Sequence, residues 1–126
     1  LEIWVIIPHF HHLEIGLQLN MILLVYTESV ATKFQYDPDK NSENIRKHGV
    51  GFEKAISVFA DPFLTISKDD SQTKEERFIA IGKSGKDQTL FVVHCYRSQN
   101  YEKEEIIRII SARKTTKAEK KSLEEL

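Results

Sequence analysis

The chain has 126 residues, of which 40% are hydrophobic and 29% charged, and its formal net charge is −1. This length fits one domain, and the composition excludes collagen-like and intrinsically disordered chains. The balanced charge excludes a polybasic nucleic-acid-binding tail, although all 18 Lys and Arg residues lie from Lys33 onward.

The segment 1–31 is predicted to be a non-native or poorly ordered extension of the domain. Its apolar stretches are too short and too interrupted to span a bilayer. It has no Lys or Arg, so it lacks the positive region of a secretory signal. We therefore expect no membrane association, a domain that spans residues 32–126, and a natural start at Met21, which is the only methionine.

A strand followed by a helix is predicted at the start of this domain. Polar and aromatic residues alternate over 31–36, which is typical of a strand. Asp37 can cap the helix that follows, Pro38 suits its first turn, and Gly49 supplies a left-handed end. The first helix is therefore predicted over Pro38 to about His48.

A second helix is predicted from Phe52, because apolar residues recur there at helical spacing until Asp61-Pro62 ends the pattern. Thr116 and Glu119 form a capping-box sequence, which predicts a last helix from Lys117. Between these helices, four β-branched or aromatic segments predict strands at Phe63–Ser67, Arg77–Gly82, Thr89–Tyr96 and Glu105–Ala112.

The loops between these four strands are too short for crossover helices, so consecutive strands are expected to be antiparallel, with a hairpin loop at Lys83–Asp87. The predicted order is β-α-α-β-β-β-β-α. The predicted fold class is α+β, with an antiparallel sheet of about four strands packed with three helices.

The first helix has polar residues where an apolar stripe is expected. Lys40, Asn44 and Lys47 occupy the positions i, i+4 and i+7, and His48 lies beside them. Such a ridge suits an anion or a phosphate chain. Alternatively, its basic C-terminal residues only complement the negative helix end, which is worth ~0.3–1 kcal/mol each. That alternative leaves Lys40 and Asn44 unexplained.

Arginines interrupt the later strands. Arg77 begins one strand, Arg108 lies among four isoleucines, and Arg113 ends the same strand. An unpaired buried charge would cost several kcal/mol, so pairing with Glu76 or Glu105 is one reading of these arginines. Arg108 and Arg113 are five residues apart and would point to opposite faces of an ideal strand. Only a bend or strand end near Ala112 could bring both to one site.

These residues together resemble the BrnT toxins of bacterial type II toxin–antitoxin pairs. The combination of a Lys-His-Gly helix end with a late Arg-Ile-Ile-Ser-Ala-Arg strand is specific to that resemblance. The matching residues are Phe34-Gln35-Tyr36-Asp37, Lys40, Asn44, Lys47-His48-Gly49-Val50, Phe52, Ala55, Val58-Phe59-Ala60-Asp61-Pro62, Glu76-Arg77, Gly82, Val92-Val93, Arg108-Ile109-Ile110-Ser111-Ala112-Arg113 and Glu119. The family often has Trp at the position of Tyr36. The tyrosine in this chain keeps an aromatic surface at that position.

The resemblance implies a RelE-like ribonuclease fold, an RNA-cleaving toxin that inhibits translation and growth, and a BrnA-like antitoxin that neutralises it. Operator DNA would be bound only through the antitoxin, and the toxin would act in the cytoplasm. The lone Cys95 excludes an internal disulfide and fits a reducing compartment. A different class remains open, namely a non-catalytic interaction module whose cationic surface binds an acidic protein partner.

Metal-free RNA cleavage requires activation of a 2′-hydroxyl, donors for the charged phosphorane and a proton for the leaving oxygen. The catalytic candidates are His48, Glu76, Arg77, Arg108 and Arg113. The RNA-binding candidates are Tyr36, Lys40, Asn44 and Lys47. Their structural alternatives are strand packing, helix capping and surface ion pairs. His94 and Cys95 are interpreted as buried, non-catalytic residues, and no metal or cofactor is predicted because no such motif is present.

Overall fold

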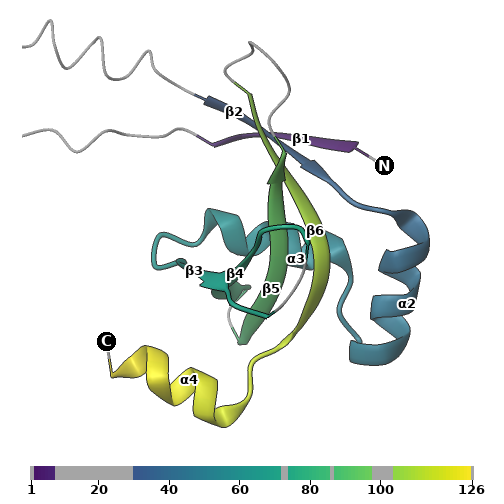
Figure 1. Ribbon diagram of the computed structural model, residues 1–126. Coiled ribbons are helices and arrows are strands. Elements are labelled where there is room, and N and C mark those ends of the chain that lie inside the picture. Colours follow the sequence, from purple (N-terminus) through teal and green to yellow (C-terminus); the bar gives the residue numbers. More distant parts are fainter. Residues whose placement is uncertain (1, 8–29, 72–73, 86, 98–103, 126) are drawn as a thin grey trace, which may run out of the picture.

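The computed structural model describes residues 2–7, 30–71, 74–85, 87–97 and 104–125, and within them the fold is α+β (Figure 1). One sheet has six strands in the order β1-β2-β6-β5-β4-β3. The strands are β1 (Glu2–Ile7), β2 (Val30–Gln35), β3 (Thr65–Asp69), β4 (Arg77–Ser84), β5 (Gln88–Arg97) and β6 (Glu104–Lys114). The helices are α2 (Pro38–His48), α3 (Phe52–Ser57) and α4 (Lys117–Glu124), with a 3-10 turn η1 (Val58–Ala60).

The predicted fold class is confirmed, but two details of the sheet are corrected. From Val30 onward the sheet has five strands rather than about four, and β1 adds a further strand at its edge. The pair β2–β6 is parallel, whereas the other pairs are antiparallel. The long connection through α2, α3 and the meander returns the chain to the same direction, which a short hairpin cannot do.

The strand β1 lies inside the segment predicted to be an extension. It pairs with β2 from Glu2↔Gln35 to Ile7↔Val30. Residues 8–29, which include Met21, lie outside the described residues. The domain boundary near residue 32 stays a prediction.

The local signals around α2 and α4 are confirmed. The Asp37 carboxylate accepts a hydrogen bond from the Asp39 N–H at 2.9 Å, and Gly49 has φ 70° at the other end of α2. In α4, Thr116 and Glu119 form the predicted reciprocal capping box. These helix ends therefore follow from interactions within a few residues.

The strand β3 begins two residues later than predicted. The Phe63 N–H donates to the Asp61 carboxylate at 2.9 Å, so residues 61–63 form a turn. The second helix is also shorter than its apolar pattern, because it tightens into η1 at Val58.

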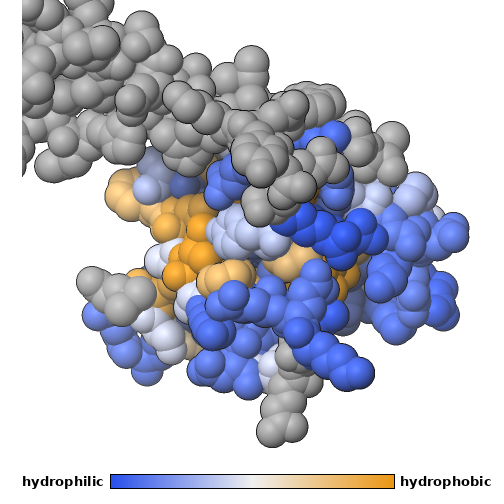
Figure 2. Space-filling model, turned by 45° about the horizontal axis from the view of Figure 1, so that its top comes forward, coloured by the Kyte–Doolittle hydropathy of each residue, from blue (hydrophilic) through white to orange (hydrophobic). Residues whose placement is uncertain are grey.

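One face of the sheet carries the core. The segments α3 and η1 pack on this face, and α2 packs against β6. The core residues include Phe34, Phe52, Val58, Leu90, Val92 and Ile109, all no more than 2% exposed. The surface over α2, at the right of Figure 2, is almost entirely hydrophilic. We call the sheet face opposite this core the open face.

Candidate functional site

A β-bulge brings Arg108 and Arg113 to the same face of the sheet. In the β5–β6 ladder, Val93 pairs with Ser111 whereas His94 pairs with Ile109, so one residue of β6 is extra. An extra residue reverses the alternation of side chains along the strand. Ile109 and Ala112 are accordingly both buried in the core, although they are three residues apart. The bend that the spacing of the two arginines requires is therefore present.

Two further arginines lie on the open face. Arg77 begins β4. Its side chain points to the same face of the sheet as that of Ile79, which pairs with Val93. Ala80, whose side chain is in the core, points to the other face. Arg97 ends β5, and its side chain points to the same face as that of Cys95, which pairs with Arg108. Arg97 is not among the residues identified from the sequence. Because side chains alternate along a strand, a residue three positions after the buried His94 is expected on the opposite face, and this signal could have identified Arg97. We call Arg77, Arg97 and Arg108 the arginine cluster.

The cluster is accompanied by the carboxylate of Glu75. Its Oε1 lies 3.4 Å from Nη2 of Arg97. The Glu75 pKa is lowered, chiefly by a hydrogen bond from the Cys95 thiol and further by the charges of Arg97 and Arg77. Burial and the same carboxylate raise the Cys95 pKa. Cys95 is therefore a neutral, buried donor, as its predicted inert role requires.

Glu76, the carboxylate predicted from the sequence, has a different position. It forms an ion pair with Lys68 at 3.2 Å, and Lys68 pairs in register with Phe78. Phe78 contacts the His94 ring on the core side of the sheet. Glu76 thus lies on the other face from the arginine cluster.

The pairing predicted for Arg108 with Glu76 or Glu105 is wrong. Glu76 is engaged by Lys68, and Glu105 accepts a hydrogen bond from Thr32 at 3.5 Å. Glu105 is three residues from Arg108 on β6, before the bulge, so the two side chains point to opposite faces. Arg108 is half-buried beside Cys95 and Gln35.

Arg113 attaches the last helix. Its guanidinium donates two hydrogen bonds to the Glu119 carboxylate, at 2.8 and 3.0 Å, and lies 4.0 Å from the centre of the Phe91 ring. This bidentate pair lowers the Glu119 pKa to about 2 and raises that of Arg113. Arg113 is on the open face as the catalytic prediction needs, but Glu119 occupies its donors.

The cationic ridge predicted on α2 is interrupted. Lys40, Lys47 and His48 are exposed, and Lys47 pairs with Glu43 at 2.8 Å. Asn44 instead points inward and is 6% exposed. Its amide donates to Val50 O at 2.8 Å and to Ala112 O at 2.7 Å, and its oxygen accepts from the Ala112 N–H at 3.2 Å. Asn44 holds α2 against β6 and is not available to RNA.

Tyr36 is also buried. It is 4% exposed, and its ring packs edge-on against Phe52 with centroids 5.5 Å apart. The structure therefore favours the packing alternative for Tyr36 over stacking on an RNA base.

His94 has the buried position that the sequence predicted. It is fully buried against Phe59, Phe78 and Tyr96, and burial lowers its pKa to about 4. A neutral His94 in this aromatic group belongs to the core.

A cavity of about 620 Å³ lies between α4 and the sheet. It is lined by Phe63, Ile81, Lys83, Thr89 and Leu123 among others, and it includes none of the arginines. Among the residues the structure describes, no group of three or more His, Cys, Asp or Glu side chains could hold a metal ion. None of the described helices is long and apolar enough to cross a membrane.

Comparisons with known proteins identify the family of this chain. The family model for "Ribonuclease toxin, BrnT, of type II toxin-antitoxin system" matches residues 36–119. The crystal structure of the Brucella abortus ribonuclease toxin BrnT is 22% identical, with 67% of this chain and 96% of that chain covered and a TM-score of 0.47. No curated protein matches. Because the family model spans two thirds of its length, the chain belongs to the BrnT family of ribonuclease toxins of type II toxin–antitoxin systems.

Proposed function

We propose that this chain is an endoribonuclease toxin that cleaves RNA without a metal ion, inhibits translation and growth, and acts in the cytoplasm. The observation that carries the proposal is the arginine cluster on the open face. Three strands contribute one guanidinium each, and Arg108 shares a face with Arg77 and Arg97 because it pairs directly with Cys95. Guanidinium groups bind phosphate oxygens bidentately, which suits a phosphodiester and its charged transition state.

The helix α2 supplies a second set of groups beside β6. Lys40 and Lys47 are exposed cations that can extend the phosphate path beyond the sheet. His48, at the end of α2, is exposed, and an imidazole can both accept and donate a proton. We assign it the delivery of a proton to the leaving oxygen. Asn44 supports this assignment indirectly, because it fixes α2 against β6.

We propose that Arg113 has a double role. In the free protein it binds Glu119, which keeps α4 beside the sheet. Its guanidinium lies on the same face as the arginine cluster and would add a phosphate donor when that pair opens.

The decisive experiment is RNA cleavage by purified protein, with and without EDTA, beside growth after induction. The parent should cleave RNA equally in both conditions and arrest growth. Arg108→Ala should lower cleavage ~10²-fold or more, because it removes transition-state stabilisation. Lys121→Ala, an exposed change on α4, is the control and should cleave like the parent.

His48→Gln tests the proton-transfer role. It should lower cleavage ~10²-fold or more and leave the denaturation curve within ~1 kcal/mol of the parent, the limit for an exposed helix-end charge. Cleavage that needs a divalent ion would refute the metal-free mechanism. A parent protein that neither binds nor cleaves RNA would instead favour the interaction module with an acidic protein partner.

A BrnA-like antitoxin is the proposed partner. We propose that a segment of it covers the open face, since this face holds the groups that must be silenced. The complex should bind operator DNA through the antitoxin. The toxin alone should not give a specific nanomolar shift of operator DNA in a gel, and such a shift would contradict this assignment.

A further inference from the structure

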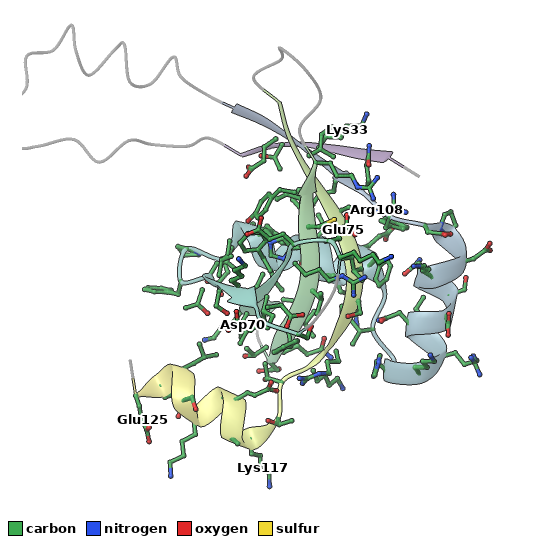
Figure 3. The ribbon with its side chains drawn as sticks, viewed as in Figure 1. Lys33, Asp70, Glu75, Arg108, Lys117 and Glu125 are labelled. Atoms are coloured by element: carbon green, nitrogen blue, oxygen red, sulfur yellow. The ribbon has the colours of Figure 1, made fainter. Side chains whose placement is uncertain are left out.

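In the described part of the chain, the Glu75 carboxylate lies against the arginines of the open face. Glu75 lies two residues before β4 and reaches β5, where its Oε1 is 3.4 Å from Nη2 of Arg97 and where the Cys95 thiol lowers its pKa. Cys95 pairs in register with Arg108. Figure 3 shows Glu75 and Arg108 toward the same end of β5 and β6. Residues of β4 and β5 therefore surround this carboxylate.

The nearby carboxylates do not share this environment. Asp69 pairs with Arg77 across β3 and β4, but its Oδ1 accepts the Ser71 N–H at 3.0 Å in a local turn. Glu76 is adjacent in sequence, yet it lies on the opposite face with Lys68. Glu75 is thus distinguished by its position among the arginines rather than by its charge.

The arginine beside Glu75 has an unused donor. Within the described part of the chain, the buried Nε of Arg77 has no hydrogen-bond partner. A buried unsatisfied donor is costly, and in native proteins it often marks a place for a ligand group. A phosphate oxygen bound between Arg77 and Arg97 would satisfy this donor and would lie next to the Glu75 carboxylate.

We propose that Glu75 is the general base of RNA cleavage, and this assignment rests on the function proposed above. The Glu75 carboxylate takes the proton of a ribose 2′-hydroxyl, and the 2′-oxygen forms a bond to the adjacent phosphorus. The bond from phosphorus to the 5′-oxygen breaks, and that oxygen leaves with a proton from His48. The products are a 2′,3′-cyclic phosphate and a 5′-hydroxyl, so atoms and charge balance without a co-reactant.

The surroundings of Glu75 suit this task. The Cys95 hydrogen bond and the charges of Arg97 and Arg77 lower the Glu75 pKa, so the group is an anion at neutral pH. The same contacts hold it in one place, with its side chain 45% exposed to an incoming RNA. A fixed, charged carboxylate within reach of the substrate is the geometric requirement for a general base.

The test compares Glu75→Gln with Glu76→Gln, two neighbouring isosteric changes on opposite faces of the sheet. Cleavage of a defined RNA, binding of the same oligonucleotide with 2′-deoxy sugars, and urea denaturation are measured for each. We expect Glu75→Gln to lower the cleavage rate ~10²-fold or more. Its binding and denaturation curve should stay close to those of the parent, and Glu76→Gln should match the parent in all three. Glu75→Asp, which keeps the base, should recover part of the rate.

A second substrate separates the base from the acid. An RNA with a bridging 5′-sulfur at the cleavage site has a leaving group that needs no proton. Glu75→Gln should remain slow on this substrate, whereas His48→Gln should recover most of its rate. Equal recovery of both variants would overturn the base assignment, because it would show that Glu75 does not act on the 2′-hydroxyl.

Other results also overturn the inference. If Glu75→Gln cleaves like the parent, the general base lies elsewhere although the ribonuclease function stands. If Glu75→Gln loses binding or stability in proportion to rate, Glu75 only positions the arginines. Products with a 5′-phosphate would exclude attack by the 2′-oxygen. Failure of the parent to cleave any RNA would refute the proposed function itself.

Discussion

The side chain of Asn44 is expected to carry an unusually large share of the stability. Asn44→Ala removes three hydrogen bonds, two to carbonyls of Val50 and Ala112 and one from the Ala112 N–H. Each such bond is worth about 0.5–1.5 kcal/mol, and leaving the partners buried without replacement adds to the loss. We expect the free energy of unfolding to fall by about 3–5 kcal/mol, a large part of the ~5–15 kcal/mol of a typical domain.

Asn44→Asp should be worse than Asn44→Ala near neutral pH. It replaces the two N–H donors with a carboxylate oxygen that faces two carbonyl oxygens in a buried site. The matched control is Asn41→Ala, which removes one partly buried bond, from the Phe52 N–H at 2.8 Å. This control should cost about 1 kcal/mol.

Urea denaturation followed by far-UV circular dichroism measures these differences. The urea concentration at the midpoint should be lowered least by Asn41→Ala, more by Asn44→Ala and most by Asn44→Asp. The first two variants should have similar slopes of unfolding free energy against urea concentration. A loss below 1 kcal/mol for Asn44→Ala, together with weaker RNA binding, would refute the structural reasoning and favour the RNA-binding role that the sequence pattern suggested.

Three further results are expected. The His94 pKa is lowered to about 4 by burial, so the unfolded chain binds a proton more readily. Stability should therefore fall as pH drops from about 6.5 to 4, by up to about 3 kcal/mol, and a His94→Phe variant melted across this range should lack that slope. A double-mutant cycle of Arg113→Ala and Glu119→Ala should give a coupling of about 1–3 kcal/mol in urea denaturation; additive losses would mean that this pair does not hold α4. Deletion of residues 1–20 should leave the far-UV spectrum of the domain intact, because the core residues whose burial the structure describes lie from Thr32 onward; a melting temperature lower by more than ~5 °C would instead make β1 an integral strand.

Several elements could be predicted from the sequence because their causes are local. The Asp37-Pro38 start and the Gly49 end of α2 act within one helical turn, as does the capping box of Thr116 and Glu119. The alternation in β4 and β5 likewise predicts buried positions, since each residue is judged against its near neighbours. Arg77, Arg108 and Arg113 were identifiable because a charge within an apolar strand is rare.

The composition of the site depends on pairings between distant residues. Arg108 and Arg113 share a face because of the bulge opposite Val93 and His94, and the sequence of β6 contains no signal for it. Asn44 looks like part of an exposed ridge until Ala112, 68 residues away, is seen to bind its amide.

The choice of Glu75 over Glu76 follows the same rule. Glu75 contacts Arg97 on β5 whereas Glu76 forms an ion pair with Lys68 on β3, so contacts with the neighbouring strands decide which carboxylate meets the arginines. Composition and local pattern are the same for both residues. Local interactions thus specify the helices and strands, whereas the register of the sheet specifies which charged groups come together.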